Sequence, residues 1–121
     1  MSQSILIQNS LKFSAKIIKL QQYLTKQKKE TIISKQIIRS ATSIGANINE
    51  ANYGSSKADF IAKMHISLKE CAETEYWIRL LKESEYITDE IFKPLITDCL
   101  SIKKRLIATL NTAKKNSQHI I

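Results

Sequence analysis

Turn-forming residues are scarce in this chain. Its 121 residues include only two glycines and one proline. A β-sheet domain of this length needs many tight turns, and glycine and proline supply their backbone angles. Long helices joined by short polar loops need far fewer such residues. The sequence therefore predicts an all-α protein whose length allows one domain with a substantial buried core.

Apolar residues recur at spacings of three and four along four segments, as expected for one face of an α-helix. These segments cover residues of about 4–26, 30–53, 57–85 and 89–115. Short polar breaks between helices of similar length predict an antiparallel up-down-up-down four-helix bundle. We expect residues 1–121 to form this single domain and the tail to fray from about residue 116.

The breaks between the helices carry recognisable end signals. Gly54 is a candidate helix C-cap, and Ser56 followed by Asp59 resembles a capping box. Thr88 is a candidate N-cap with two acids directly after it, where the helix dipole favours negative charge. Pro94 lies too deep for a first-turn proline, so it predicts a kink or a helix that starts one residue before it.

Three of the predicted helices have apolar residues outside their main stripe, which widens their apolar faces. These extra residues are Ile7, Leu11 and Ile18 on the first helix, Ile66, Trp77 and Leu80 on the third, and Ile96, Leu100 and Ile107 on the fourth. Such faces on a monomer would invite aggregation, so they predict a subunit interface and a homo-oligomer. The alternative is an irregular bundle with a thick core.

Positive charge is concentrated in the first and last helices. The net charge is +8, and the sequence pI is about 9.6. The first helix has no acidic residue before Glu30, although solvated helices usually mix both signs. This pattern favours a phosphate-binding surface over a merely basic one. The predicted contacts are Lys12, Lys16, Lys19, Lys26, Lys28 and Lys29 from the first helix and turn, and Lys93, Lys103, Lys104, Arg105, Lys114 and Lys115 from the last helix.

The basic faces predict contact with the nucleic-acid backbone and no reading of base sequence. Tyr23 is the main aromatic residue near them, so stacking on unpaired bases has little support. There is no helix-turn-helix or zinc pattern that would read bases. We expect binding to a nucleic acid without base specificity, and to structured RNA in particular; the alternative partner is an acidic protein.

Catalytic and cofactor signals are weak. The only histidines are His65 and His119, and the Glu70-x-x-Glu73 pair has no second metal-binding motif to face it. Cys71 and Cys99 lie on apolar stretches, as buried free thiols of a reducing compartment do. No segment has the length and apolarity of a membrane span. We therefore expect a cytoplasmic protein that is not an enzyme and uses no metal or cofactor.

The stretch RSATSIGANINEA, residues 39–51, resembles a known family pattern. That pattern includes Ser-Ile, Asn-Ile and a glutamate on the second helix, then a phenylalanine, then Ser-x-x-Glu and a tyrosine near a helix end. The matching residues here are Ser43, Ile44, Asn47, Ile48, Glu50, Phe60, Ser67, Glu70 and Tyr86. The chain is similar, over essentially its whole length, to the bacterial four-helix bundle proteins related to the 23S rRNA intervening-sequence protein. Accessory variability determinant proteins of diversity-generating retroelements are part of this group.

The resemblance implies a four-helix bundle that assembles as a homopentamer. For the retroelement members it also implies binding to nucleic acid and to a partner reverse transcriptase. Two positions depart from the pattern. Gly45 stands where proline is frequent, and Ala51 stands where glycine usually follows the glutamate. Neither change removes a charged or hydrogen-bonding side chain, so they bear on a local kink and on the helix end.

Small and polar residues line one side of the second helix beside its apolar face. We interpret them as a structural motif in which Asn47 finds hydrogen-bond partners on the third helix. The motif consists of Ser40, Ser43, Asn47, Glu50, Ser67 and Glu70. It would hold the second helix against the third or against a neighbouring subunit. The alternative is a ligand or catalytic pocket.

Overall fold

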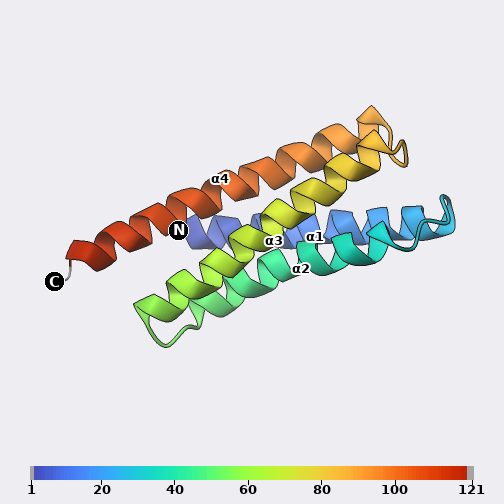
Figure 1. Ribbon diagram of the computed structural model, residues 1–121. Helices are drawn as coiled ribbons and strands as arrows, with labels where there is room; N and C mark the ends of the chain where they lie inside the picture. The colour runs from blue at the N-terminus through green and yellow to red at the C-terminus, as the bar shows by residue number, and fades with distance from the viewer. Residues whose placement is uncertain (1, 120–121) are drawn as a thin grey trace.

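Four helices in an up-down arrangement make up the computed structural model, which describes residues 2–119 and the side chains of residues 5–116 (Figure 1). The helices are α1 (Ser2–Lys26), α2 (Ile33–Asn52), α3 (Lys57–Glu83) and α4 (Asp89–His119). Each helix packs against its neighbour in the chain, and α1 closes the bundle against α4. The predicted all-α bundle is confirmed. No helix among the described residues has the length and apolarity to cross a membrane.

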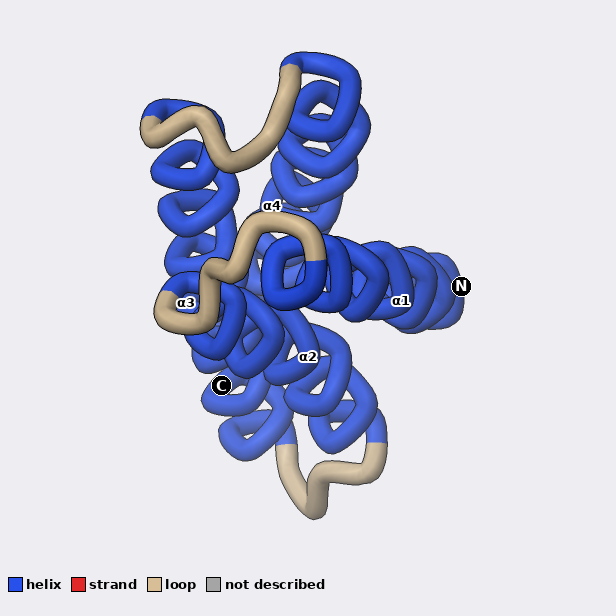
Figure 2. The backbone as a smooth tube through the Cα atoms, turned by 90° about the vertical axis from the view of Figure 1, so that its right-hand side faces the viewer, coloured by secondary structure: helices blue, strands red, loops and turns tan. Residues whose placement is uncertain are grey.

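The bundle opens towards the end that carries both chain termini. The contact of α1 with α4 is the least extensive of the four helix pairs. The starting end of α1 and the final end of α4 lie apart both in Figure 1 and in the view turned by 90° in Figure 2. Helix α4 continues to His119, beyond its predicted end near residue 115. The last two residues of the tail predicted to fray lie outside the described part of the chain.

One apolar core runs through the bundle, and every helix contributes to it. Its largest fully buried side chains include Phe13 and Ile17 of α1, Ile44 and Ile48 of α2, Met64 and Ile78 of α3, and Ile102 and Leu106 of α4. Full burial of such a side chain stabilises the fold by about 1.5–3 kcal/mol. These residues belong to the main apolar stripes expected from the three- and four-residue spacing. Burial of these stripes holds the helices in this arrangement.

A buried glutamate caps the start of α2. Glu30 is 7% exposed, and its carboxylate accepts hydrogen bonds from the backbone N–H groups of Ile32, Ile33 and Ser34 at 2.8–3.0 Å. First-turn N–H groups have no partner within the helix, and the helix dipole favours an anion there. Lys29 adopts a left-handed φ of 56° just before this residue. The helix therefore starts at Ile33 and not near residue 30, because Glu30 caps it from outside.

The turn between α2 and α3 leaves little space for a side chain at Gly54. The C-cap of α2 is Tyr53 and not Gly54, and the φ of Gly54 is not positive. A Cβ atom at Gly54 would lie 2.6 Å from Oδ2 of Asp59 and 3.1 Å from the carbonyl oxygen of Ala51. The N-cap prediction for α3 is confirmed, because Oγ of Ser56 accepts a hydrogen bond from the Asp59 N–H at 3.1 Å.

Helix α4 starts at the predicted cap and continues through its proline. The N–H of Phe92 donates to the Thr88 carbonyl oxygen at 2.8 Å, and the N–H of Ile91 donates to Thr88 Oγ1 at 3.4 Å. Pro94 lies inside the helix, so the alternative start beside it is wrong. Pro94 and Glu90 are both exposed, and water can therefore satisfy the Glu90 carbonyl that lacks an N–H partner.

Two buried hydroxyl contacts join α2 to α3. Ser40, Ser67 and Thr74 are fully buried. The Ser67 hydroxyl donates to the Ile44 carbonyl oxygen at 2.8 Å. Thr74 Oγ1 lies 2.8 Å from Ser40 Oγ of α2 and 2.8 Å from the Glu70 carbonyl oxygen of its own helix, so the two hydroxyl groups share a hydrogen bond across the helices. Buried hydroxyl groups need partners, and these bonds exist only at one alignment of the two helices. We call this pair of contacts the hydroxyl seam; it fixes the position of α3 along α2.

The predicted motif on α2 is only partly engaged with α3. Ser40 and Ser67 lie in the hydroxyl seam, Glu50 pairs with Lys63 at 3.0 Å, and a Glu70 oxygen lies 3.9 Å from Arg39. The expected bonds from Asn47 to α3 are wrong. Asn47 Nδ2 instead donates within α2 to the carbonyl oxygen and the hydroxyl of Ser43, at 2.8 and 3.1 Å. Asparagine side chains readily make such local bonds.

The hydroxyl seam predicts unequal effects for two alanine substitutions. Ser67→Ala removes a buried hydrogen bond between helices and should lower the free energy of unfolding by about 1 kcal/mol. Asn47→Ala removes only bonds within its own helix and should cost less than about 0.5 kcal/mol, as partly exposed positions usually do. Urea unfolding followed by circular dichroism measures both values. A larger loss for Asn47→Ala than for Ser67→Ala would contradict this description of the seam.

Candidate nucleic-acid interface

Four of the predicted lysines lie on one exposed face of α1. At about 100° per residue, they fall within an arc of about 80°. Lys28 and Lys29 continue the charge into the turn before α2, where Lys28 Nζ lies 5.9 Å from the centre of the Tyr23 ring. All six side chains are exposed. We call the four helical residues the α1 lysine face: Lys12, Lys16, Lys19 and Lys26.

The α1 lysine face borders α4. Lys16 Nζ lies 2.6 Å from Asp98 Oδ2, and the two side chains are 52% and 36% exposed. A small hollow of about 170 Å³ beside this pair is lined by Asn9 and Lys12 from α1 and by Ser101 from α4. An exposed ion pair contributes at most about 1 kcal/mol. A phosphate group can therefore compete with Asp98 for Lys16.

The predicted cations of α4 do not share one face. Lys93, Lys104 and Lys115 are exposed and separated by eleven residues, which places them on one line along the helix. Lys103 and Arg105 flank that line on opposite sides, each about 100° from Lys104. Lys103 faces α3, whereas Arg105 lines a groove near the end of the bundle. The α4 cations therefore do not form one continuous basic face. Lys114 is exposed.

A three-residue ion cluster joins α3 to α4. Lys103 Nζ lies 2.9 Å from Glu75 Oε1, and Arg79 Nε lies 3.0 Å from Glu75 Oε2. The hydrogen bond from Lys103, with a further one from Arg79, lowers the pKa of Glu75 below its ordinary value, against the opposing effect of burial. The same hydrogen bond raises the pKa of Lys103. Lys103 therefore serves the fold and is the least available of the predicted phosphate contacts on α4.

The lowered pKa of Glu75 predicts a pH-dependent contribution to stability. The contribution is fully present above the ordinary carboxyl pKa of 4.5 and is lost as pH falls through the lower pKa of the folded state. Glu75→Gln should therefore destabilise the protein at pH 7, and the difference from the original protein should shrink as the pH falls below 4.5 and through the lowered pKa of the folded state. Urea unfolding across this pH range measures it. Glu83→Gln, at an exposed position on the same helix, is the matched control. An equal difference at every pH would contradict the linkage.

Acidic residues of α3 are largely engaged with neighbouring side chains. Arg39 of α2 lies 2.7 Å from Glu73 Oε2, and the Trp77 indole N–H donates to the same oxygen at 3.0 Å. Trp77, predicted to lie on an exposed second stripe, is half-buried. The negative charge of α3 is separate from the α1 lysine face, because α1 does not contact α3.

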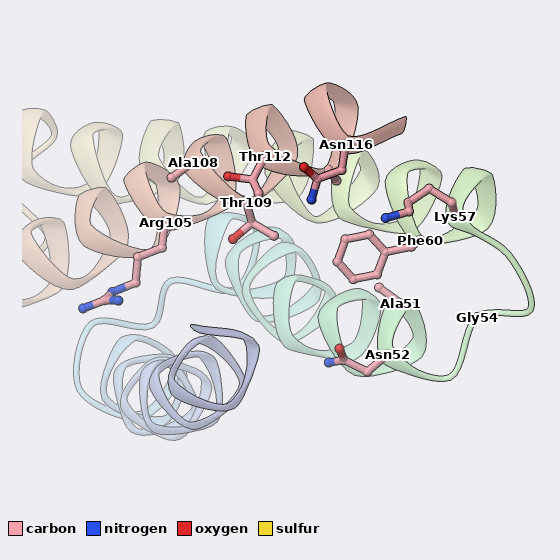
Figure 3. Close-up of a pocket in the computed structure, with 11 residues that line it drawn as sticks. Ala51, Asn52, Gly54, Lys57, Phe60, Arg105, Ala108, Thr109, Thr112 and Asn116 are labelled. Carbon is pink, nitrogen blue, oxygen red and sulfur yellow. The ribbon is translucent and has the colours of Figure 1, made fainter. Parts of the chain in front are cut away.

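A groove of about 630 Å³ lies where α4 separates from the α2–α3 turn (Figure 3). One wall is a stripe of α4 that consists of Arg105, Ala108, Thr109, Thr112, Ala113 and Asn116. The opposite wall includes Asn52 from the end of α2 and Lys57 and Phe60 from the start of α3. The α4 stripe is mostly small side chains, so space remains between the two walls. We call this feature the end groove. The spacing of residues in the sequence does not predict it.

The candidate metal and catalytic residues do not converge. Among the described side chains, no group of three or more His, Cys, Asp or Glu residues is placed to hold a metal ion. His65 is exposed on α3, and the His119 side chain lies outside the described ones. Cys71 and Cys99 are fully buried free thiols whose sulfur atoms lie 3.9 Å apart. Their mutual hydrogen bonding and their burial raise the pKa of the Cys99 thiol, which keeps it protonated.

The fold and its charge pattern define a basic up-down four-helix bundle. Residues 2–108 match the family model of the 23S rRNA-intervening sequence protein. The chain is 46% identical to a protein of unknown function from the S23 ribosomal protein family of Bacteroides thetaiotaomicron, known from a crystal structure. The two structures align with a TM-score of 0.90 over 92% of this chain and 99% of the other. No match was found among curated proteins. The chain belongs to the 23S rRNA-intervening sequence protein family.

Proposed function

We propose that this protein is a non-enzymatic scaffold or accessory subunit that binds structured RNA in the cytoplasm through the α1 lysine face. The observation that carries the proposal is an exposed cationic helix surface without acidic residues. Glu30 is the first acid in the chain, and its carboxylate is consumed by the cap of α2. Nothing on α1 itself therefore neutralises the lysines, and only Lys16 has a described partner, on α4.

The geometry supports contact with phosphates. Lys12 and Lys26 are fourteen residues apart, or about 21 Å along the helix. A nucleic-acid duplex presents one phosphate per about 1.7 Å of its axis, so several phosphates lie within reach of such a face. Exposed lysines hold phosphates as point charges and do not select a base. The proposed recognition is therefore of the shape and charge of folded RNA.

Removing two lysines of this face should reduce both RNA affinity and its salt dependence. Lys12 and Lys19 have no described ion-pair partner, so we choose the double variant Lys12→Gln/Lys19→Gln. The slope of log K against log[salt] changes by about 0.7–0.9 for each phosphate contact. The double variant should therefore shrink the slope by about 1.5 for a labelled hairpin RNA. Fluorescence anisotropy titrations at several salt concentrations measure it.

The matched control removes the same charge from other helices. Lys35 of α2 and Lys69 of α3 are exposed, and Lys35→Gln/Lys69→Gln should leave the slope nearly unchanged. Equal slopes for the two double variants would mean that binding reflects net charge alone. Absence of RNA binding even at low salt would contradict the proposal. The basic surface would then serve an acidic protein partner.

Self-association is part of the same proposal. Leu11 is 71% exposed and Ile18 is 44% exposed on α1, next to the lysine face. Leu100 and Ile107 of α4 and Ile66 of α3 are about 40% exposed, whereas Ile96 is buried. Adjacent exposed apolar side chains favour burial against another subunit. We propose a homo-oligomer, and a homopentamer from the family resemblance.

Light scattering at micromolar concentration tests the assembly. The original protein should have the mass of an oligomer, and five subunits would match the family resemblance. Leu11→Ser/Ile18→Ser should lower the mass towards that of a monomer, because it removes apolar surface that only assembly would bury. Both positions are exposed, so the fold should persist in circular dichroism. A monomer mass for the original protein would contradict the proposal.

A further inference from the structure

We propose that the end groove binds unpaired nucleotides of the RNA, with a base stacked on Phe60 and the phosphates held by Arg105 and Lys57. This inference rests on the proposed function and extends it, because the α1 lysine face accounts for binding to the backbone of folded RNA alone. Part of the α4 wall lies beyond residue 108, where the match to the family model ends.

The length of the groove suits a short single strand. Arg105 and Asn116 mark the two ends of the α4 wall and are eleven residues apart, or about 16 Å along the helix. Stacked nucleotides rise by about 3.4 Å each, so about four of them fit this length. In Figure 3, Arg105 lies at one end of the groove and Lys57 at the other.

The groove has positive charge at both ends and no carboxylate in its lining. Lys57 and Arg105 are exposed and have no ion-pair partner among the described side chains. The acid nearest in sequence is Asp59, which is not a lining residue, although its carboxylate lies against Gly54, which is. Asn52, Asn116, Thr109 and Thr112 add polar groups to the lining, although the Asn52 amide also donates to the Ile48 carbonyl oxygen at 3.2 Å (Figure 3). Such a lining suits an anionic and polar ligand.

Phe60 supplies the aromatic surface that the α1 lysine face lacks. It is half-buried at the start of α3, and Figure 3 shows its ring between the end of α2 and the Thr109–Asn116 side of α4. Stacking of a base on an aromatic side chain is tolerant of sequence because every base has a flat π-face. A charged groove with such a ring is the usual arrangement of single-strand sites. Phe60 matches the family pattern, but the resemblance gives it no role in ligand binding.

The end groove continues the α1 lysine face. The pair of Lys16 with Asp98 sets the alignment of α1 against the antiparallel α4. Lys12 lies one turn before Lys16 on α1, beside Ser101 of α4. Arg105 lies one turn beyond Ser101 on α4. Cations therefore lead from the α1 lysine face to the mouth of the groove. A hairpin held on α1 would present its unpaired end there. A second copy of this chain is the other possible occupant, but the charged, polar lining suits it less.

A paired-probe experiment tests the inference. One probe is a blunt hairpin RNA, and the other is the same hairpin with a four-nucleotide unpaired tail. The original protein should bind the tailed hairpin about tenfold more tightly, as expected for one aromatic–base stack. Phe60→Leu retains apolar volume but removes the ring, and it should abolish the preference for the tail while leaving the affinity for the blunt hairpin unchanged. Arg105→Gln should also reduce the preference.

The two proposals fail in different ways. Equal binding of both hairpins, or an unchanged preference in Phe60→Leu, would overturn the groove and leave the α1 proposal standing. If the blunt hairpin does not bind, the α1 proposal fails, and a six-nucleotide unpaired RNA then tests the groove alone. Binding of that RNA that is weakened by Phe60→Leu supports the groove, and no binding overturns it. A change in oligomer mass caused by Arg105→Gln would assign the groove to a second copy and overturn the inference.

Discussion

The hydroxyl seam between α2 and α3 is the contact on which the rest of the bundle depends. Ser67 and Thr74 place hydroxyl groups inside a mostly apolar core, and their contacts with α2 form only at one alignment of the two helices. Helix α2 also packs closely against α1, since a Cβ atom at Gly45 would lie 3.1 Å from Ser10 Oγ. Helix α2 therefore positions both of its neighbours. It runs unbroken through Gly45, where the family pattern often has proline.

This arrangement separates the charges of the chain. Acidic residues are concentrated on α3, where Arg39, Arg79 and Lys103 pair with them. The one acid that precedes α2 is Glu30, and it is buried in a cap. The lysines of α1 consequently form a positive surface of their own. Because like charges on one helix do not support each other, this surface costs some stability and is more readily explained by a ligand than by the fold.

The sequence predicts the helices well, because the spacing of apolar residues reports directly on the buried face of each one. It predicts the α1 lysine face for the same reason, since spacing along one helix determines its faces. It fails where the outcome depends on a second helix. We predicted Glu30 to lie within a helix, but it caps one from outside. We predicted Asn47 to contact α3, but it bonds to Ser43 on its own helix. We predicted Arg105 to be part of a basic face, but it lines the end groove. That groove exists because α4 separates from the α2–α3 turn.

The central claim is that the α1 lysine face is where RNA binds, and lysine acetylation footprinting tests it most directly. The protein is acetylated with and without a saturating hairpin RNA, and each lysine is quantified by mass spectrometry. We predict that RNA protects Lys12, Lys19 and Lys26, whereas Lys35 and Lys69 on the neighbouring helices react equally in both samples. Equal reactivity of the α1 lysines with RNA bound, or protection confined to Lys35 and Lys69, would contradict it.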